Sequence, residues 1–168
     1  MKLLFISLGC DKNLVDSEEM LGMLAADGHE IVDDEDEAEV IIVNTCCFIG
    51  DAKEESVNTI LEMAEKKKAG TCKVLIVTGC MAQRYKKEIS EEIPEVDAIL
   101  GTTSYGDISK AVKEAQAGRH FEEYKSIDFL PDISGKRMLT TGGHFAYLKI
   151  AEGCDKHCTY CIIPRLRG

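Results

Sequence analysis

Three of the eight cysteines stand close together near the end of the 168-residue sequence. Cys154, Cys158 and Cys161 have the spacing C-x3-C-x2-C. Thiolates are the ligands that iron–sulfur clusters prefer, so three cysteines in one loop can bind three irons of a [4Fe–4S] cluster. The fourth iron then has no protein ligand and can bind a substrate. Zinc is the main alternative, but a structural zinc takes four ligands, and only His157 accompanies the three cysteines.

Three further cysteines are far apart in the sequence but share a position relative to predicted strands. Cys10, Cys46 and Cys80 follow the first, third and fourth of the apolar runs expected to form strands. Parallel strands end at one edge of a sheet, so the topology predicts that these thiols converge on a second three-cysteine cluster site. Each cysteine also precedes or opens a helix, whose dipole is expected to lower the thiol pKa. The alternative is three buried structural cysteines.

The last two cysteines, Cys47 and Cys72, lack this placement. Cys47 adjoins a candidate ligand and could be a spare thiol, whereas Cys72 has no predicted task. Gly9 and Gly79 each precede a candidate ligand, and we expect them to permit tight backbone turns around a cluster.

The elements that must position these cysteines are short apolar runs alternating with amphipathic runs, as far as residue 118. Apolar runs rich in Val, Ile and Leu are typical of strands buried on both faces of a parallel sheet. We therefore predict an α/β fold with a doubly wound five-stranded parallel sheet in the flavodoxin-like order 2-1-3-4-5. The predicted strands are residues 3–8, 29–32, 40–44, 74–78 and 98–100.

The first domain is predicted to cover residues 1–118. Residues 119–143 have no helical period and are interpreted as a linker, with one strand near residues 122–124. Residues 144–168 begin a second domain, in which a strand over residues 145–150 leads into the cysteine loop. Because little of that domain is present, we expect the chain to be part of a longer protein.

Composition excludes some classes of function. Hydrophobic residues make up 45% of the chain and charged residues 30%, as in globular proteins. The net charge of −10 argues against a broad nucleic-acid-binding face, since phosphate binding requires a basic surface. No stretch approaches the roughly 20 apolar residues that a membrane span requires. We expect a cytoplasmic protein, in which cysteines serve metal binding rather than disulfides.

The whole chain resembles the methylthiotransferases of the radical S-adenosylmethionine superfamily, whose cysteine signature has the same spacing and an aromatic residue at the position of Tyr160. Residues 9–13 and 162–168 resemble the branch that modifies an aspartate of ribosomal protein twelve of the small subunit more than the tRNA-modifying branch. Asp11 and Cys47 depart from that branch, which often has Pro and Gly there. The matching stretches are residues 7–18, 43–46, 48–56, 78–85 and 151–168.

The resemblance implies two [4Fe–4S] clusters, S-adenosylmethionine and an external electron donor. Reductive cleavage of S-adenosylmethionine at the radical cluster would give a radical that abstracts hydrogen from the β-carbon of the target aspartate. An auxiliary cluster would carry the sulfur that is methylated and transferred. The implied ligands are Cys154, Cys158 and Cys161 for the radical cluster, with Tyr160 beside it, and Cys10, Cys46 and Cys80 for the auxiliary cluster.

Two alternatives remain open. A tRNA methylthiotransferase would use the same clusters on a nucleic-acid substrate. An iron–sulfur redox sensor or electron carrier would use them without a substrate, although the second cysteine loop argues against it. We predict no turnover from these residues by themselves, because most of a radical barrel is missing from them.

Overall fold

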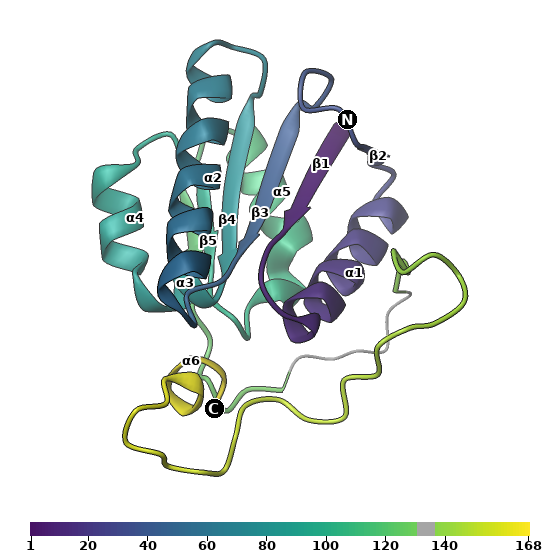
Figure 1. Cartoon of the computed structure of the whole chain (residues 1–168). Helices are drawn as coiled ribbons and strands as arrows, with labels where there is room; N and C mark the ends of the chain where they lie inside the picture. The colour runs from purple at the N-terminus through teal and green to yellow at the C-terminus, as the bar shows by residue number, and fades with distance from the viewer. Residues whose placement is uncertain (131–136) are drawn as a thin grey trace.

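A computed structural model of the chain describes residues 1–130 and 137–168. It is an α/β fold built on a six-stranded sheet in the order β2-β1-β3-β4-β5-β6, with every neighbouring pair parallel. Helices cover both faces of the sheet, and the segment after the last strand passes beneath the carboxyl ends of the strands (Figure 1).

The elements follow the alternation that the sequence indicates. The strands are β1 (Lys2–Ser7), β2 (Glu30–Val32), β3 (Val40–Thr45), β4 (Val74–Gly79), β5 (Ala98–Leu100) and β6 (Phe121–Glu123). The helices are α1 (Asp11–Ala26), α2 (Gly50–Lys68), α3 (Cys80–Arg84), α4 (Lys86–Glu92), α5 (Ile108–Gln116) and α6 (Ile163–Arg167), with a 3-10 turn, η1, at Tyr105–Asp107.

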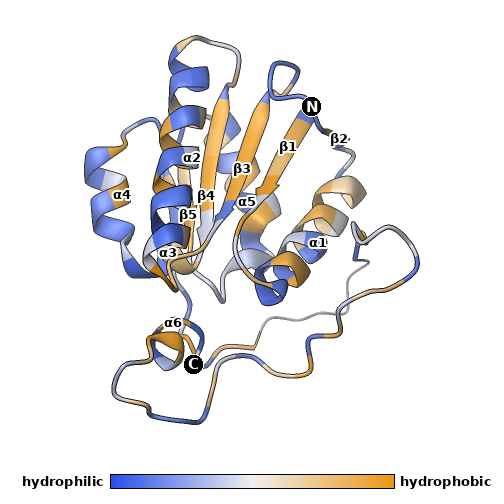
Figure 2. Ribbon diagram, in the orientation of Figure 1, coloured by the Kyte–Doolittle hydropathy of each residue, from blue (hydrophilic) through white to orange (hydrophobic). Residues whose placement is uncertain are grey.

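The core lies on both sides of the two central strands. All six residues of β3 and all six of β4 are buried, which explains the run of four apolar residues that begins each strand (Figure 2). One face packs against α2 and α4 through residues such as Ile60, Met63 and Ile89. The other face packs against α1 and α5 through residues such as Leu24 and Ile108.

The predicted order of the first five strands is confirmed, but the predicted count of five is wrong. β6 adds a sixth strand, pairing Ala98 with Phe121 in parallel at the edge of the sheet. Phe121 also packs against the core beneath α5, so the segment gains apolar burial as well as ladder hydrogen bonds. The strand expected near residues 122–124 therefore belongs to the sheet. Residues 131–136 of the predicted linker lie outside the described residues.

Residues 145–150, predicted as a strand, are irregular. A strand requires a neighbour for its backbone N–H and C=O groups, and this segment runs beside helix α1 instead of beside a sheet edge. Leu148 and Ile150 are 83% and 88% exposed. Among the described residues, no helix combines the length and apolar character needed to cross a membrane.

Candidate metal centre

The thiols of Cys10, Cys46 and Cys80 line one open cavity of about 1080 Å³ at the carboxyl edge of the sheet. Cys10 caps α1 after β1, Cys46 directly follows β3, and Cys80 begins α3 after β4. Cys10 is exposed, whereas Cys46 and Cys80 are each 6% exposed. The parallel topology thus brings together three residues that are 36 and 34 positions apart in sequence (46 − 10 and 80 − 46). Their role as ligands stays a prediction.

Two glycines let the cysteine loops approach one another. Gly9 has φ +94°, and a Cβ there would lie 2.6 Å from Cys46 Cβ and 2.9 Å from its Sγ. Gly79 also has φ +94°, and a Cβ would lie 2.5 Å from the backbone oxygen of Thr45. A side chain at either position would therefore push two cysteine-bearing loops apart.

Buried polar side chains fix the same loops. Asn13 is fully buried, and its Nδ2 donates to the backbone oxygens of Leu8 and Thr45, both at 2.9 Å. The Oγ of Ser56 accepts from Cys46 N at 3.0 Å and donates to Cys46 O at 2.8 Å. The loops after β1 and β3 are therefore held by hydrogen bonds from side chains of α1 and α2.

Burial dominates the electrostatics of the interior thiols. It raises the pKa of the Cys80 thiol, and the Arg167 guanidinium only partly offsets this. The sequence led us to expect a lowered pKa for Cys80, whereas its pKa is raised because burial disfavours the thiolate. Burial likewise raises the pKa of Cys47 to about 11. Cys47 and Cys72 pack into the apolar core beneath α2.

The second cysteine set is less tightly gathered. Cys158, Cys161 and Tyr160 line a cavity of about 510 Å³, and Cys154 does not line it. The backbone N–H of Cys161 donates to Cys158 O at 3.1 Å, which keeps those two residues in one turn. Cys154 and Cys158 are exposed, and Tyr160 is 91% exposed. In residues 1–130 and 137–168, no three His, Cys, Asp or Glu side chains are spaced to bind a single metal ion.

The two cavities share a wall. Phe48, in the loop after Cys46, lines both of them and is 57% exposed. Ile163 and Arg167 of α6 line the first cavity, while Arg165 of the same helix lines the second. Groups bound in the two cavities would therefore lie on either side of one short helix and one aromatic side chain.

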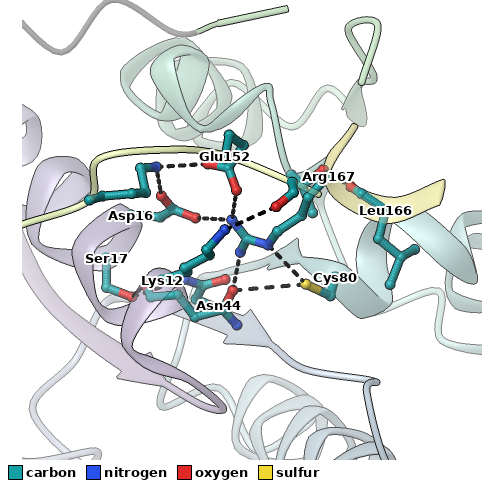
Figure 3. A network of polar contacts seen from close by, with 12 residues as sticks. Lys12, Asp16, Ser17, Asn44, Cys80, Glu152, Leu166 and Arg167 are labelled. Atoms are coloured by element: carbon teal, nitrogen blue, oxygen red, sulfur yellow. Dashed lines mark hydrogen bonds and ion pairs between the residues drawn. The ribbon is translucent and has the colours of Figure 1, made fainter. Parts of the chain in front are cut away.

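A buried network of charges joins the second cysteine segment to α1. Arg167 Nη1 donates to Asp16 Oδ2 at 2.9 Å and to Glu152 Oε1 at 2.8 Å (Figure 3). Lys149 Nζ lies 2.5 Å from Asp16 and 2.9 Å from Glu152. Lys12 Nζ adds a longer contact of 3.4 Å to the backbone oxygen of Gly153.

A second anchor lies further along α1. The Glu18 side chain is fully buried and forms an ion pair with Arg137, whose Nε lies 2.7 Å away. Thr140 donates to it from its backbone N at 2.6 Å and from Oγ1 at 2.8 Å. Burial opposes ionisation of Glu18, but these hydrogen bonds outweigh it and hold its pKa below the usual value.

Reasoning from the sequence did not identify these charged residues as part of the site. The signal that could have found two of them is the position of Asp16 and Glu18, which lie among buried residues on both sides in α1. A carboxylate in such a position requires a cation or hydrogen-bond donors from elsewhere in the chain.

Comparison with known proteins shows the family of the chain. The model of a family described as "Uncharacterized protein family UPF0004" matches residues 2–101, which include Cys10, Cys46 and Cys80. A relative from Lachnoclostridium phytofermentans, named ribosomal protein uS12 methylthiotransferase RimO, is 63% identical over all 168 residues. Relatives of the same name from Clostridioides difficile and Trichlorobacter lovleyi are 52% and 50% identical, over 100% and 99% of the chain. The chain spans 38%, 38% and 37% of the lengths of these three relatives.

Proposed function

Because the chain belongs to the family UPF0004, we propose that it carries the two cluster sites of an enzyme that adds a methylthio group to the β-carbon of an aspartate in ribosomal protein uS12. The observation that carries the proposal is the convergence of Cys10, Cys46 and Cys80 on one cavity. The name shared by relatives 50–63% identical to this chain supports the choice of substrate.

The donor set and the space at the first cavity suit a cluster better than a single metal ion. Three cysteines line an open volume of about 1080 Å³. Among the described residues that line it, no further cysteine or histidine is present, and the carboxylates are Asp11, Asp51 and Glu55. Three thiolates match three irons of a [4Fe–4S] cluster and leave the fourth iron open.

At the second cavity, Cys158 and Cys161 would form two ligands and Cys154 would complete the set when the loop closes on the cluster. Metal binding commonly orders its own ligand loop, so two gathered cysteines and one outlying cysteine are compatible with loading. Tyr160 lines this cavity and would lie next to the bound group. When bound, the clusters supply one-electron chemistry on S-adenosylmethionine and carry the sulfur to be transferred.

The chain's own residues would hold the two groups close together and limit solvent. Phe48 separates the cavities, and Ile163 closes part of the first. Such positioning is the main contribution that a protein makes to cofactor-based radical chemistry. An external electron donor completes the set of partners.

A tRNA substrate is the second candidate within the same chemistry. The net charge of −10 on these residues disfavours phosphate binding here, which supports the protein substrate. Clusters that only carry electrons are commonly held by four cysteines, whereas each set here has three, so the open iron that each set would leave supports an enzyme instead.

Cluster counting tests the proposal in the full-length protein reconstituted anaerobically with iron and sulfide. We expect about two clusters per chain in the parent and about one in each of Cys10→Ala and Cys158→Ala. Cys72→Ser is the matched control, because Cys72 lies in the core and its replacement retains a donor for Val74 O. One cluster in the parent would overturn the two-site proposal.

Mass spectrometry of reaction products tests the substrate. Full-length protein supplied with S-adenosylmethionine, a reductant and either uS12 or tRNA should add a methylthio group to an aspartate of uS12. Modification of tRNA alone would favour a tRNA methylthiotransferase. Reversible reduction of both clusters without modification of either substrate would favour an electron carrier.

A further inference from the structure

The guanidinium of Arg167 lies against a thiol of the first cysteine set, although the residue belongs to the segment that carries the second set. Its side chain is 2% exposed. Nε donates to Cys80 Sγ at 3.4 Å (Figure 3). Nη2 donates to Asn13 Oδ1. The first cavity is therefore lined partly by a residue 87 positions away from Cys80.

The charges around Arg167 balance. Arg167 and Lys149 supply two cations, and Asp16 and Glu152 supply two carboxylates, with side-chain exposures between 2% and 11%. A buried arginine without such partners would be strongly disfavoured, and removal of one partner from a buried pair leaves an uncompensated charge. The network therefore fixes the guanidinium at one place, beside the Cys80 sulfur.

We propose that Arg167 is a positioning residue that couples the two cysteine sites: it anchors the second cysteine segment on α1 and donates an N–H···S hydrogen bond to the Cys80 sulfur when that sulfur is a cluster ligand. The inference rests on the proposed function, in which Cys80 binds the first cluster. Hydrogen bonds to ligand sulfurs and nearby positive charge favour the reduced form of an iron–sulfur cluster. Arg167 therefore raises the reduction potential of the first cluster and ties it to the folding of the second cysteine segment.

The anchoring half of the proposal is tested in the full-length protein without clusters. In Arg167→Met, the segment loses its most buried link to α1, and we expect Cys80 to react with iodoacetamide at least about tenfold faster than in the parent. The amide of Cys154, which donates to Gly168 O, should also exchange hydrogen faster. Arg119→Met is the matched control, since Arg119 pairs with Glu114 on an exposed surface.

A double variant separates the hydrogen bond to sulfur from the stability of the fold. Arg167→Met alone leaves Lys149 with two carboxylates, whereas Asp16→Asn combined with Arg167→Met leaves Lys149 paired with Glu152 and no net charge. The double variant should regain much of the thermal stability lost in the single variant. It still lacks the guanidinium beside Cys80.

The potential is measured in the Cys158→Ala background, so that the first cluster alone contributes to the titration. We expect a more negative midpoint potential in the double variant than in its parent, and no shift in Arg119→Met. An unchanged potential, or a Cys80 alkylation rate in Arg167→Met no faster than in Arg119→Met, overturns this inference. Absence of any cluster in the Cys158→Ala protein would instead overturn the proposed function, and the alkylation rates still decide whether Arg167 anchors the segment.

Discussion

Gly79 directly precedes Cys80 and sets the direction in which the chain leaves β4. Its replacement by alanine should destabilise the protein far more than most glycine-to-alanine changes. Its backbone has φ +94° and ψ −160°, a region that residues with a Cβ occupy at a cost of about 1–3 kcal/mol. A Cβ would also lie 2.8 Å from Thr45 N and 2.5 Å from Thr45 O, so β3 and β4 would have to separate locally. Overpacking of this kind costs about 1–3 kcal/mol more.

The expected loss for Gly79→Ala is therefore about 2–6 kcal/mol of unfolding free energy, on the order of half the stability of an ordinary domain. Gly118→Ala is the matched control. Gly118 has φ +71°, and a Cβ there would have nothing within 4 Å, so only the backbone cost of about 1 kcal/mol applies.

Urea titrations of both variants, extrapolated linearly to water, measure the difference. The reasoning fails if the two variants lose the same free energy, because the collision with β3 would then contribute nothing. Reconstituted Gly79→Ala should also bind less iron at the first cavity, since the shift of β4 moves Cys80.

Three further outcomes follow from contacts around the cysteines. Glu18→Gln should lower the unfolding free energy by about 2 kcal/mol at pH 7, because charge-assisted hydrogen bonds are lost. Because folding lowers the pKa of Glu18, its contribution to the unfolding free energy is present above the ordinary glutamate pKa of about 4.3 and is lost as the pH falls through the pKa of the folded state. The unfolding free energies of parent and variant should therefore converge in acid. A constant difference between them down to about pH 3 would contradict this assignment. Cys47 has a pKa of about 11 and should be alkylated at pH 8 at least about a hundredfold more slowly than the exposed Cys158. Peptide mass spectrometry follows both rates, and equal rates would mean that Cys47 is not buried. Ser56→Ala should cost about 1–3 kcal/mol in a urea titration, because Cys46 N and O lose their partner; a loss below about 0.5 kcal/mol would show that water replaces the hydroxyl.

The strand order and the meeting of the thiols could be predicted because both follow from short-range patterns and one topological rule. β3 and β4 each begin with four apolar residues and are buried throughout, and parallel strands place whatever follows them at one edge. β6 was harder, because Phe121–Glu123 contains two glutamates and takes its place from pairing with β5 rather than from its own propensity. Residues 145–150 failed in the opposite way: the apolar pattern is present, and no sheet edge lies beside it.

The buried charges of α1 could not be predicted from local sequence, since their partners lie 119 to 151 positions away. A helical pattern alone would place Asp16 and Glu18 in solvent. The structure buries both because the segment after β6 returns across α1, so this helix packs on the sheet with one face and receives the returning chain with another. Cys10 caps the same helix, and Asp16 binds Arg167 less than two turns further on. The second cysteine segment therefore docks on the same helix that carries a cysteine of the first site at its amino end.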